Sequence, residues 1–298
     1  MIIDIHLHAV RKKSLPHESA GGNFATPEEL IRIMNRTGVD KGVLLPNVNP
    51  EARTQYTTTE DVLEICQKYP RRFIPFCNID PRAENNTPKA DLSRQLSYYK
   101  KAGCKGVGEI CANLYFDDPF TLNFFRHCEK TSMPVLFHIA PHAGGLYGLI
   151  DDLHLPRLEK CVKKFPKLIF IGHSQCFWSE ISGDVTNKTR GEYPKGPVRS
   201  GGAVPKLLEK YKNIYADISA GSGLNALTRD PEFGYGFMEK FRDKLFFGTD
   251  ICSPERVYPH AQYIRKALKE GKISRETFEK ITWRNINKIL KLGLRGAA

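Results

Sequence analysis

The chain begins MIIDIHLH over residues 1–8, an apolar run with two histidines near its end. Side chains of an extended strand alternate between two faces. The predicted faces are Asp4, His6 and His8 on one side and Ile3, Ile5 and Leu7 on the other. Two imidazoles two residues apart at a strand end suit a cation such as Zn²⁺. Two histidines satisfied within a core are the alternative.

Seven further apolar stretches of strand length follow along the chain, and each is bounded by polar, helix-compatible sequence. They are GVLLPN at 42–47, RFIPFCNI at 72–79, KGVGEI at 105–110, MPVLFHI at 133–139, KLIFIGH at 167–173, NIYADIS at 213–219 and KLFFGTD at 244–250. The predicted helices cover residues 27–37, 59–69, 87–103, 118–131, 156–165, 203–211, 231–243, 260–269 and 274–291. Strands that alternate with helices predict a parallel sheet, and eight repeats predict closure into a TIM (β/α)8 barrel. A doubly wound open sheet is the alternative fold.

Length and composition agree with one globular domain over residues 1–298. The chain has 298 residues and 41% hydrophobic content, slightly more than the roughly 250 residues typical of such a barrel. Charges or glycines interrupt every apolar segment, so no membrane span is expected. A strand that starts at Ile2 leaves no room for a secretory signal, so we expect a cytoplasmic protein. The eight scattered cysteines, without a CxxC pair, are expected to be free thiols.

The formal net charge of +12 raises the question of a nucleic-acid partner. Lys and Arg are spread along predicted helices in mixed-sign runs such as RETFEKITWRNINKILK, which is typical of solvated helix faces. Nucleic-acid binding is therefore not expected.

One connection is unusually long, because about 29 residues, 174–202, separate the sixth strand from its helix. Such a length in a compact domain indicates a functional loop or a lid.

Four other predicted strands also end in a residue that suits metal binding or proton transfer. These residues are Glu109, His138, His173 and Asp250. Barrel enzymes place their catalytic residues at the C-terminal ends of the strands. The coincidence of these residues with the histidine pair of the first strand predicts an active site at that face.

In this ordered set of motifs the chain resembles the amidohydrolase superfamily, especially the amidohydrolase 2 branch that includes the aminocarboxymuconate-semialdehyde decarboxylases. The motifs that carry the resemblance are IDIHLH, FHI, IGHS, YADIS and FGTDICSP, and they span nearly the whole chain. The resemblance implies that His6, His8, His138 and Asp250 bind a metal. It also implies that His173 is either a ligand of a second metal or a catalytic acid or base.

Glu109 departs from the pattern of urease-like members, because the fourth strand has no lysine at its end that could be carboxylated. Its context, KGVGEI, is similar to the GEIG segment of TatD-like deoxyribonucleases, where a glutamate contributes to the metal site. This raises a two-metal site bridged by Glu109, with a carboxylate paired to a basic side chain as the alternative. The eighth strand reads GTDICSP and not the ETD pattern of TatD-like nucleases.

The remaining candidates carry less weight. His17, His127, His154 and His260 lie in predicted loops or helices and are set aside as surface residues. His142, four residues after His138, lies where a loop could reach over the site. Asp217 on the seventh strand is expected either to orient a ligand or substrate, or to be a plain carboxylate of the barrel interior.

The predicted activity is hydrolysis of an amide, lactone or ester of a small anionic substrate, with a divalent cation activating water and Asp250 and His173 as catalytic groups. The cofactor is expected to be one or two ions of zinc, with manganese or iron as alternatives. A non-oxidative decarboxylase of an aromatic or dienoic carboxylate is the chief alternative, followed by a TatD-like nuclease and a noncatalytic metal-binding protein.

The long connection is expected to cover the site and to contact the substrate through Trp178 and Arg190. It also holds Phe177 and Tyr193, and three further cations that suit an anion: Lys188, Lys195 and Arg199. The same aromatic residues would serve a contact between copies of the chain, so a homo-oligomer is the alternative role, and solvated charge is the alternative role of the cations.

Overall fold

The computed structural model describes residues 1–16, 22–51, 55–256 and 258–295. Its strands are β1 Ile3–Leu7, β2 Lys41–Leu44, β3 Phe73–Pro75, β4 Val107–Ile110, β5 Val135–Ala140, β6 Leu149–Ile150, β7 Phe170–His173, β8 Ile214–Asp217 and β9 Leu245–Phe246. Eight of them correspond to the eight predicted strands, and the two-residue β6 is additional.

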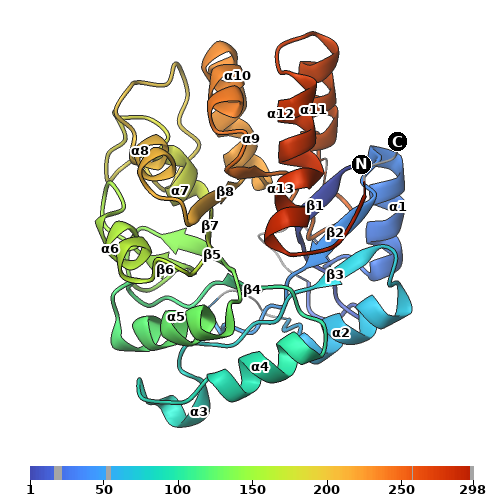
Figure 1. Cartoon of the computed structure of the whole chain (residues 1–298), viewed down its shortest axis with the longest axis vertical. Coiled ribbons are helices and arrows are strands. Elements are labelled where there is room, and N and C mark those ends of the chain that lie inside the picture. The colour runs from blue at the N-terminus through green and yellow to red at the C-terminus, as the bar shows by residue number, and fades with distance from the viewer. Residues whose placement is uncertain (17–21, 52–54, 257, 296–298) are drawn as a thin grey trace.

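All strand pairs are parallel, and backbone hydrogen bonds join two sheets into one ring (Figure 1). One sheet has the order β1-β2-β3, and the other has the order β4-β5-β7-β8-β9, with β6 beside β5. Cys77 N donates to Gly106 O at 3.0 Å between β3 and β4. Ile5 N donates to Phe247 O at 2.9 Å between β1 and the end of β9. The ring is closed, so the barrel prediction is confirmed and the open doubly wound sheet is wrong.

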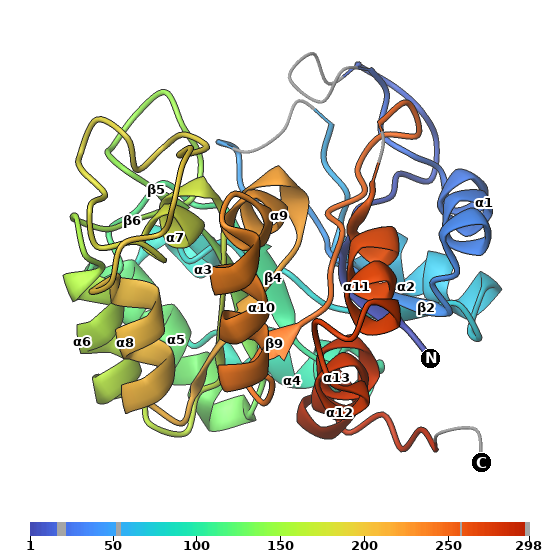
Figure 2. The ribbon, with the colours of Figure 1, turned by 90° about the horizontal axis from the view of Figure 1, so that it is seen from above.

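Helices surround the strands in the order expected for a barrel (Figures 1 and 2). They are α1 Pro27–Thr37, α2 Thr59–Lys68, α3 Ala83–Asn86, α4 Ser93–Lys101, α5 Pro119–Thr131, α6 Pro156–Lys164, α7 Gln175–Ser179, α8 Ala203–Lys210, α9 Ala220–Thr228, α10 Pro231–Lys240, α11 His260–Lys269, α12 Arg275–Glu279 and α13 Asn285–Ile289. Helix α1 begins as its sequence predicts, because the Thr26 side chain accepts from Glu29 N and the Glu29 side chain accepts from Thr26 N.

Three helix predictions needed correction. The single helix expected over 87–103 is α4 alone, preceded by the short α3. The helix expected over 274–291 is α12 and α13 joined by a π-helical turn, η2 Lys280–Arg284. Helix α9 was missed, because its sequence AGSGLNALT contains two glycines and two threonine or serine residues that weaken the helical pattern.

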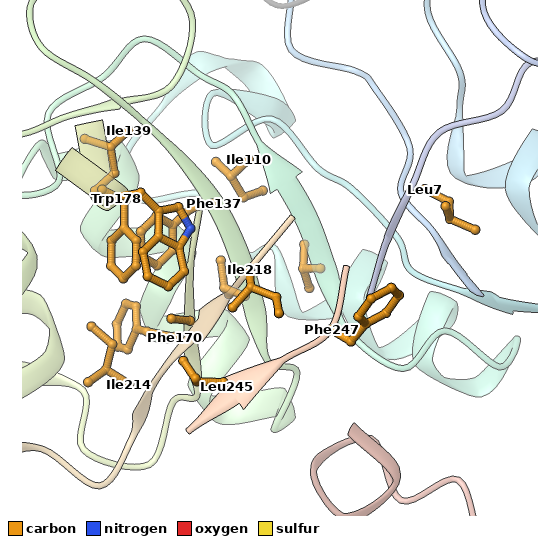
Figure 3. Packing of buried hydrophobic residues seen from close by; sticks show 14 of the residues in the cluster. Leu7, Ile110, Phe137, Ile139, Phe170, Trp178, Ile214, Ile218, Leu245 and Phe247 are labelled. Carbon is orange, nitrogen blue, oxygen red and sulfur yellow. The ribbon is translucent and has the colours of Figure 1, made fainter. Parts of the chain in front are cut away.

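The core has two layers. Helices pack on the outside of the barrel through a large apolar cluster that includes Phe137, Phe170 and Phe247 (Figure 3). A second cluster combines Ile3, Ile5 and residues of other strands with Ile286 of the C-terminal α13 and with Leu290, which follows that helix, and it fills the barrel interior. The loops that follow the strands lie on the side opposite the N-terminus (Figure 2).

The prediction that Ile3, Ile5 and Leu7 share one face of β1 was wrong. Ile3 and Ile5 belong to the inner cluster, whereas Leu7 packs in the outer cluster. The pairing of β1 with β2 shifts register between Asp4 and Leu7. Such an irregularity changes the alternation of side chains within a strand. It allows His6 to face the interior directly after Ile5.

The eight cysteines are free and buried, as the sequence predicts. Within the described part of the chain, no helix is long and apolar enough to cross a membrane.

Candidate metal centre

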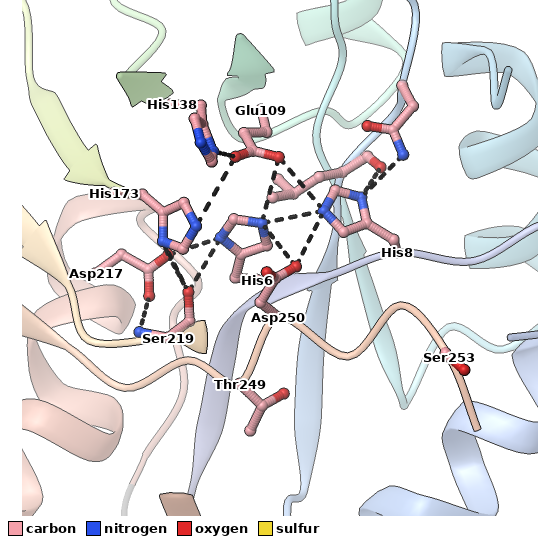
Figure 4. Close-up of polar contacts among 12 residues, drawn as sticks. His6, His8, Glu109, His138, His173, Asp217, Ser219, Thr249, Asp250 and Ser253 are labelled. Carbon is pink, nitrogen blue, oxygen red and sulfur yellow. Dashed lines mark hydrogen bonds and ion pairs between the residues drawn. The ribbon is translucent and has the colours of Figure 1, made fainter. Parts of the chain in front are cut away.

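His6 and His8 meet at the C-terminal end of β1, and both are buried (Figure 4). The Nδ1 atom of His6 lies 2.7 Å from Asp217 Oδ2, a carboxylate oxygen that accepts the Nδ1 proton. The Nδ1 atom of His8 lies 3.2 Å from the carbonyl oxygen of Leu45, which can only accept. Nδ2 of Asn47 lies slightly farther from His8 Nδ1, at 3.3 Å. With the proton of each ring on Nδ1, both Nε2 atoms present lone pairs, and they lie 3.0 Å apart. Two lone pairs at this separation repel each other unless a cation lies between them.

Two carboxylates complete a group of four donor atoms. Oε2 of Glu109 lies 3.6 Å from the Nε2 atoms of both His6 and His8. Oδ1 of Asp250 lies 3.5 Å from the same two nitrogens. Ligands about 2.1 Å from a tetrahedral zinc ion are about 3.4 Å from one another. The distances from each carboxylate to the two nitrogens therefore fit a bound divalent cation.

Glu109 also faces a second pair of histidines. Its Oε1 atom accepts from Nδ1 of His138 at 2.8 Å and lies 3.9 Å from Nε2 of His173. The carboxylate thus separates the two histidine pairs, with one oxygen toward each. Among the described residues, two groups have ligand atoms close enough to hold an ion: His6 with Glu109 and His173, and His6 with His8 and Asp250.

The chain reaches this arrangement through local features that the sequence displays. Gly108 precedes Glu109, and a Cβ atom on Gly108 would lie 2.4 Å from the carbonyl oxygen of Leu136. Only glycine allows β4 to approach β5 this closely. Asp250 has a left-handed backbone (φ 57°), and its N–H donates to His6 O at 2.9 Å. The neighbouring Thr249 is held by the buried Asp4, which accepts from its N–H and hydroxyl.

The charge of the site favours a cation. Burial lowers the pKa of His8, which keeps it neutral. Burial opposes protonation of His6 as well, but the carboxylates of Asp250, Asp217 and Glu109 outweigh it and raise its pKa well above the ordinary value. Burial would raise the pKa of Glu109, yet its hydrogen bond with His138 and its contacts with His6 and His8 lower it. Three carboxylates therefore surround a group of imidazoles, and together they attract a proton or a metal ion.

Two predicted substrate residues are not brought to this cluster. Trp178 is a residue of α7. Its side chain is buried in the hydrophobic core, with 1% exposure, and its Nε1 donates to Asp217 O at 2.8 Å. Arg190 is equally buried, and its Nη1 donates to Asp151 O at 2.9 Å. The long connection also contains the buried Phe177, whereas Tyr193 is exposed. The aromatic residues of α7 thus pack against the barrel beneath the loop.

The histidines set aside from the sequence have other partners. His154 contacts Glu180, His260 contacts the carbonyl oxygen of Ala220, and His127 lies near Asp91. His142 is exposed and contacts the next residue in its loop. His17 lies outside the described residues.

One contributor escaped the sequence analysis. Ser219 is completely buried, and its hydroxyl lies between Asp217, His6 and His173. Its only sequence signal is its position two residues after Asp217, at the end of the stretch NIYADIS. That spacing places it beside the site only because of how the chain turns into α9.

Comparison with known proteins gives one family and a common fold. The model of a family described as amidohydrolase matches residues 3–292. Comparison with curated proteins gives no match. An uncharacterised TIM-barrel protein from Bordetella bronchiseptica superposes with a TM-score of 0.65 at 16% identity, over 99% of each chain.

Two further solved structures carry names that describe an activity. A probable 2-pyrone-4,6-dicarboxylic acid hydrolase from Acinetobacter baumannii, with citric acid bound, has a TM-score of 0.59 at 16% identity, over 97% of this chain and 99% of its own. A dihydroxybenzoic acid decarboxylase from Polaromonas sp. JS666, with bound manganese and the inhibitor 2-nitroresorcinol, has a TM-score of 0.58 at 17% identity, over 99% of this chain and 98% of its own. At these identities the likeness shows the fold alone.

Proposed function

The chain belongs to the amidohydrolase family, and on that premise we propose that it is a metal-dependent hydrolase that cleaves an amide, lactone or ester of a small anionic substrate. Its family and fold fit hydrolysis and decarboxylation alike, since proteins of both names share the barrel. The choice of hydrolysis rests on the arrangement of the site.

The donors that would hold the metal are nitrogen and oxygen atoms, which suit zinc or manganese. His6, His8 and Asp250 would hold one ion, and His6, Glu109 and His173 would hold a second. His138 is the sixth proposed ligand and hydrogen-bonds to Glu109 at 2.8 Å. When bound, a divalent cation supplies Lewis acidity, which lowers the pKa of a water molecule towards about 7 and polarises a substrate carbonyl.

Glu109 is the observation that carries the proposal. Its two oxygens divide between two histidine pairs, at 3.6 Å from His6 and His8 and at 2.8 Å from His138. A carboxylate placed between two clusters suits a centre that gathers positive charge around an attacking water. Decarboxylation needs a cation to hold the substrate carboxylate and a proton donor, and it makes no use of such a bridge.

Asp250 and His173 are the proposed catalytic groups. The Asp250 side chain is the more exposed of the site carboxylates at 25%, so its Oδ1 can take a proton from attacking water. His173 presents Nε2 towards Glu109, and in the form of the enzyme that holds a single ion this atom, once protonated, would donate to the substrate oxygen or to the leaving group. Because the surrounding imidazoles are buried, these groups act where bulk water does not screen them.

An anionic substrate is favoured by two facts. The chain carries a formal net charge of +12, which attracts anions over distance. The structurally similar proteins named above bind citric acid or are named for dicarboxylic and dihydroxybenzoic acids.

We further propose that residues 1–298 form one domain, that the protein is cytoplasmic, and that it has no nucleic-acid or membrane partner. Size-exclusion chromatography of the purified protein tests whether it forms a homo-oligomer.

The test combines metal analysis with a substrate panel. Purified protein is analysed for zinc, manganese and iron, and is then assayed on lactones, amides, esters, phosphodiesters and aromatic carboxylates. We expect one or two ions per chain and activity on a lactone, amide or ester, with ¹⁸O from labelled water in the acid product. Release of CO₂ from an aromatic carboxylate without ¹⁸O incorporation would establish the decarboxylase instead. A folded protein that binds none of these metals would overturn both.

A further inference from the structure

Ser219 stands at the N-cap of α9, yet its side chain does not cap the helix. The preferred role of serine at this position is to accept a hydrogen bond from a backbone N–H of the first helical turn, which contributes about 1 kcal/mol. In α9 no such side-chain bond forms. Other helices of the chain do use the cap, as Ser274 does when it accepts from Thr277 N. The hydroxyl of Ser219 is therefore engaged elsewhere.

The hydroxyl turns into the metal centre instead (Figure 4). It donates to Asp217 Oδ2 at 2.7 Å, and its oxygen lies 3.1 Å from Nδ1 of His173 and 3.3 Å from Nδ1 of His6. The other oxygen of Asp217 accepts from Ser219 N at 2.9 Å. Asp217 and Ser219 thus form a compact unit at the end of β8, and both are completely buried.

The available hydrogen-bond acceptors determine which ring nitrogens of His6 and His173 carry a proton. Both oxygens of Asp217 face donors: Oδ1 accepts from Ser219 N, and Oδ2 accepts from Nδ1 of His6 at 2.7 Å and from the Ser219 hydroxyl. The hydroxyl has then used its one proton, so its oxygen accepts from Nδ1 of His173 at 3.1 Å, and Asp217 Oδ2 lies slightly farther from the same nitrogen, at 3.3 Å. Both histidines consequently carry the proton on Nδ1.

Neighbouring residues make room for this unit and hold it in place. A Cβ atom on Gly248 would lie 2.4 Å from Asp217 Oδ1 and 2.8 Å from Ser219 Cβ, so the segment after β9 can pass this close only without a side chain. The indole of Trp178 donates to Asp217 O at 2.8 Å and fixes the backbone from the other side. Three separate segments of the chain therefore converge on Asp217 and Ser219.

We propose that Ser219 is a positioning residue that, together with Asp217, holds the Nδ1 protons of His6 and His173 and thereby turns the Nε2 atoms of both rings into the site. Asp217 and Ser219 would thereby orient one histidine in each of the two groups of candidate ligands. His6 faces His8, and His173 faces Glu109. The part of this proposal that concerns metal affinity rests on the proposed function. The part that concerns the Nδ1 protons describes the metal-free protein and is independent of that function.

The first test reads the tautomers directly. Long-range ¹H–¹⁵N spectra of metal-free, ¹⁵N-histidine-labelled protein distinguish Nδ1–H from Nε2–H imidazoles. We expect Nδ1 of both His6 and His173 to carry a proton in the wild type. In Ser219→Ala, His173 should become a mixture of tautomers, because it loses the acceptor at 3.1 Å and keeps only the longer contact with Asp217 Oδ2 at 3.3 Å, while His6 keeps Asp217 at 2.7 Å. An unchanged Nδ1–H signal for His173 would overturn the proposal.

The second test measures zinc affinity by chelator competition. Removing a group that orients metal ligands typically weakens affinity tenfold to a hundredfold, or about 1.4–2.8 kcal/mol, and we expect Ser219→Ala to fall in that range. Ser222→Ala is the matched control, because Ser222 is a buried serine of the same helix whose hydroxyl has no hydrogen-bond partner. It should bind zinc within twofold of the wild type.

The outcomes separate this proposal from the proposed function. If the wild type binds no metal but Ser219→Ala shifts the His173 tautomer, the metal-dependent activity fails and the positioning role stands. If the wild type binds zinc and Ser219→Ala matches it within twofold, the positioning role fails and the metal centre stands. Should Ser219→Ala not fold, Ser219→Gly replaces it in both tests, because glycine is accepted at N-cap positions.

Discussion

Replacing Glu109 with glutamine tests the centre at the residue shared by both of its halves. The Glu109→Gln side chain has nearly the same shape, and its amide oxygen can still accept from Nδ1 of His138, now 2.8 Å away. The change therefore removes one negative charge and little else. We expect the barrel to fold and the metal affinity to fall steeply.

The size of the effect follows from the distances. Oε2 of Glu109 lies 3.6 Å from Nε2 of His6 and of His8. If that separation is taken as the distance from the carboxylate to a cation held by the two nitrogens, each unit of cation charge interacts with it by roughly 4–5 kcal/mol at an effective dielectric constant of about 20. This corresponds to about three orders of magnitude in a dissociation constant. Because the amide oxygen stays with His138, the amide NH2 group faces His6 and His8 in place of Oε2, and we expect a loss of roughly 100- to 1,000-fold.

The assay is competition with a fluorescent zinc chelator, supported by metal quantitation and by thermal unfolding of the chelator-treated proteins. Glu180→Gln is the control, because Glu180 is also a fully buried carboxylate, which accepts from His154 N at 2.7 Å outside the cluster. It should lose stability and keep its zinc affinity. A Glu109→Gln protein that binds zinc within threefold of the wild type would falsify the bridging role.

Three further predictions follow from the same geometry. His6→Ala and His8→Ala should each abolish zinc binding and leave the far-ultraviolet circular dichroism of the barrel intact, because both side chains lie at the end of β1; unfolding of both variants would contradict that placement. Gly248→Ala should cost about 1–3 kcal/mol in urea unfolding and weaken zinc binding, since its Cβ would lie 2.4 Å from Asp217 Oδ1, and a neutral substitution would show that the space is not needed. The raised pKa of His6 gives stability to the metal-free protein that is complete below its unfolded value of 6.5 and is lost as pH rises. Urea unfolding of the metal-free wild type should therefore weaken between pH 7 and 8, and His6→Ala should lose this slope; a flat wild-type profile would oppose it.

The strand count and the face that carries the site could be predicted from sequence because both depend on local patterns. Apolar runs of strand length alternate with helical segments, and parallel strands bring their C-terminal ends to one face. His6, His8, Glu109, His138, His173 and Asp250 all lie at such ends, and the structure brings them together. No long-range information is needed to place each of them at the tip of its strand.

The roles of Trp178 and Arg190 could not be predicted in this way. Both lie in a long connection whose composition suits a lid, and sequence alone gives no direction for their side chains. In the structure the indole reaches Asp217 O and the guanidinium reaches Asp151 O, each 39 residues away in sequence. Burial of such large side chains against the barrel is decided by packing, which has no short-range pattern.

The sequence by itself therefore determined the barrel, the family and the set of residues at its C-terminal face. Tertiary structure decided how those residues are oriented. The register shift in β1 turns His6 inward after Ile5, and the hydrogen bond of His6 with Asp217 joins residues 211 positions apart. Contacts of this kind exist only once the ring of strands has closed, because closure brings the end of β9 beside β1, with β8 as the next strand in the ring.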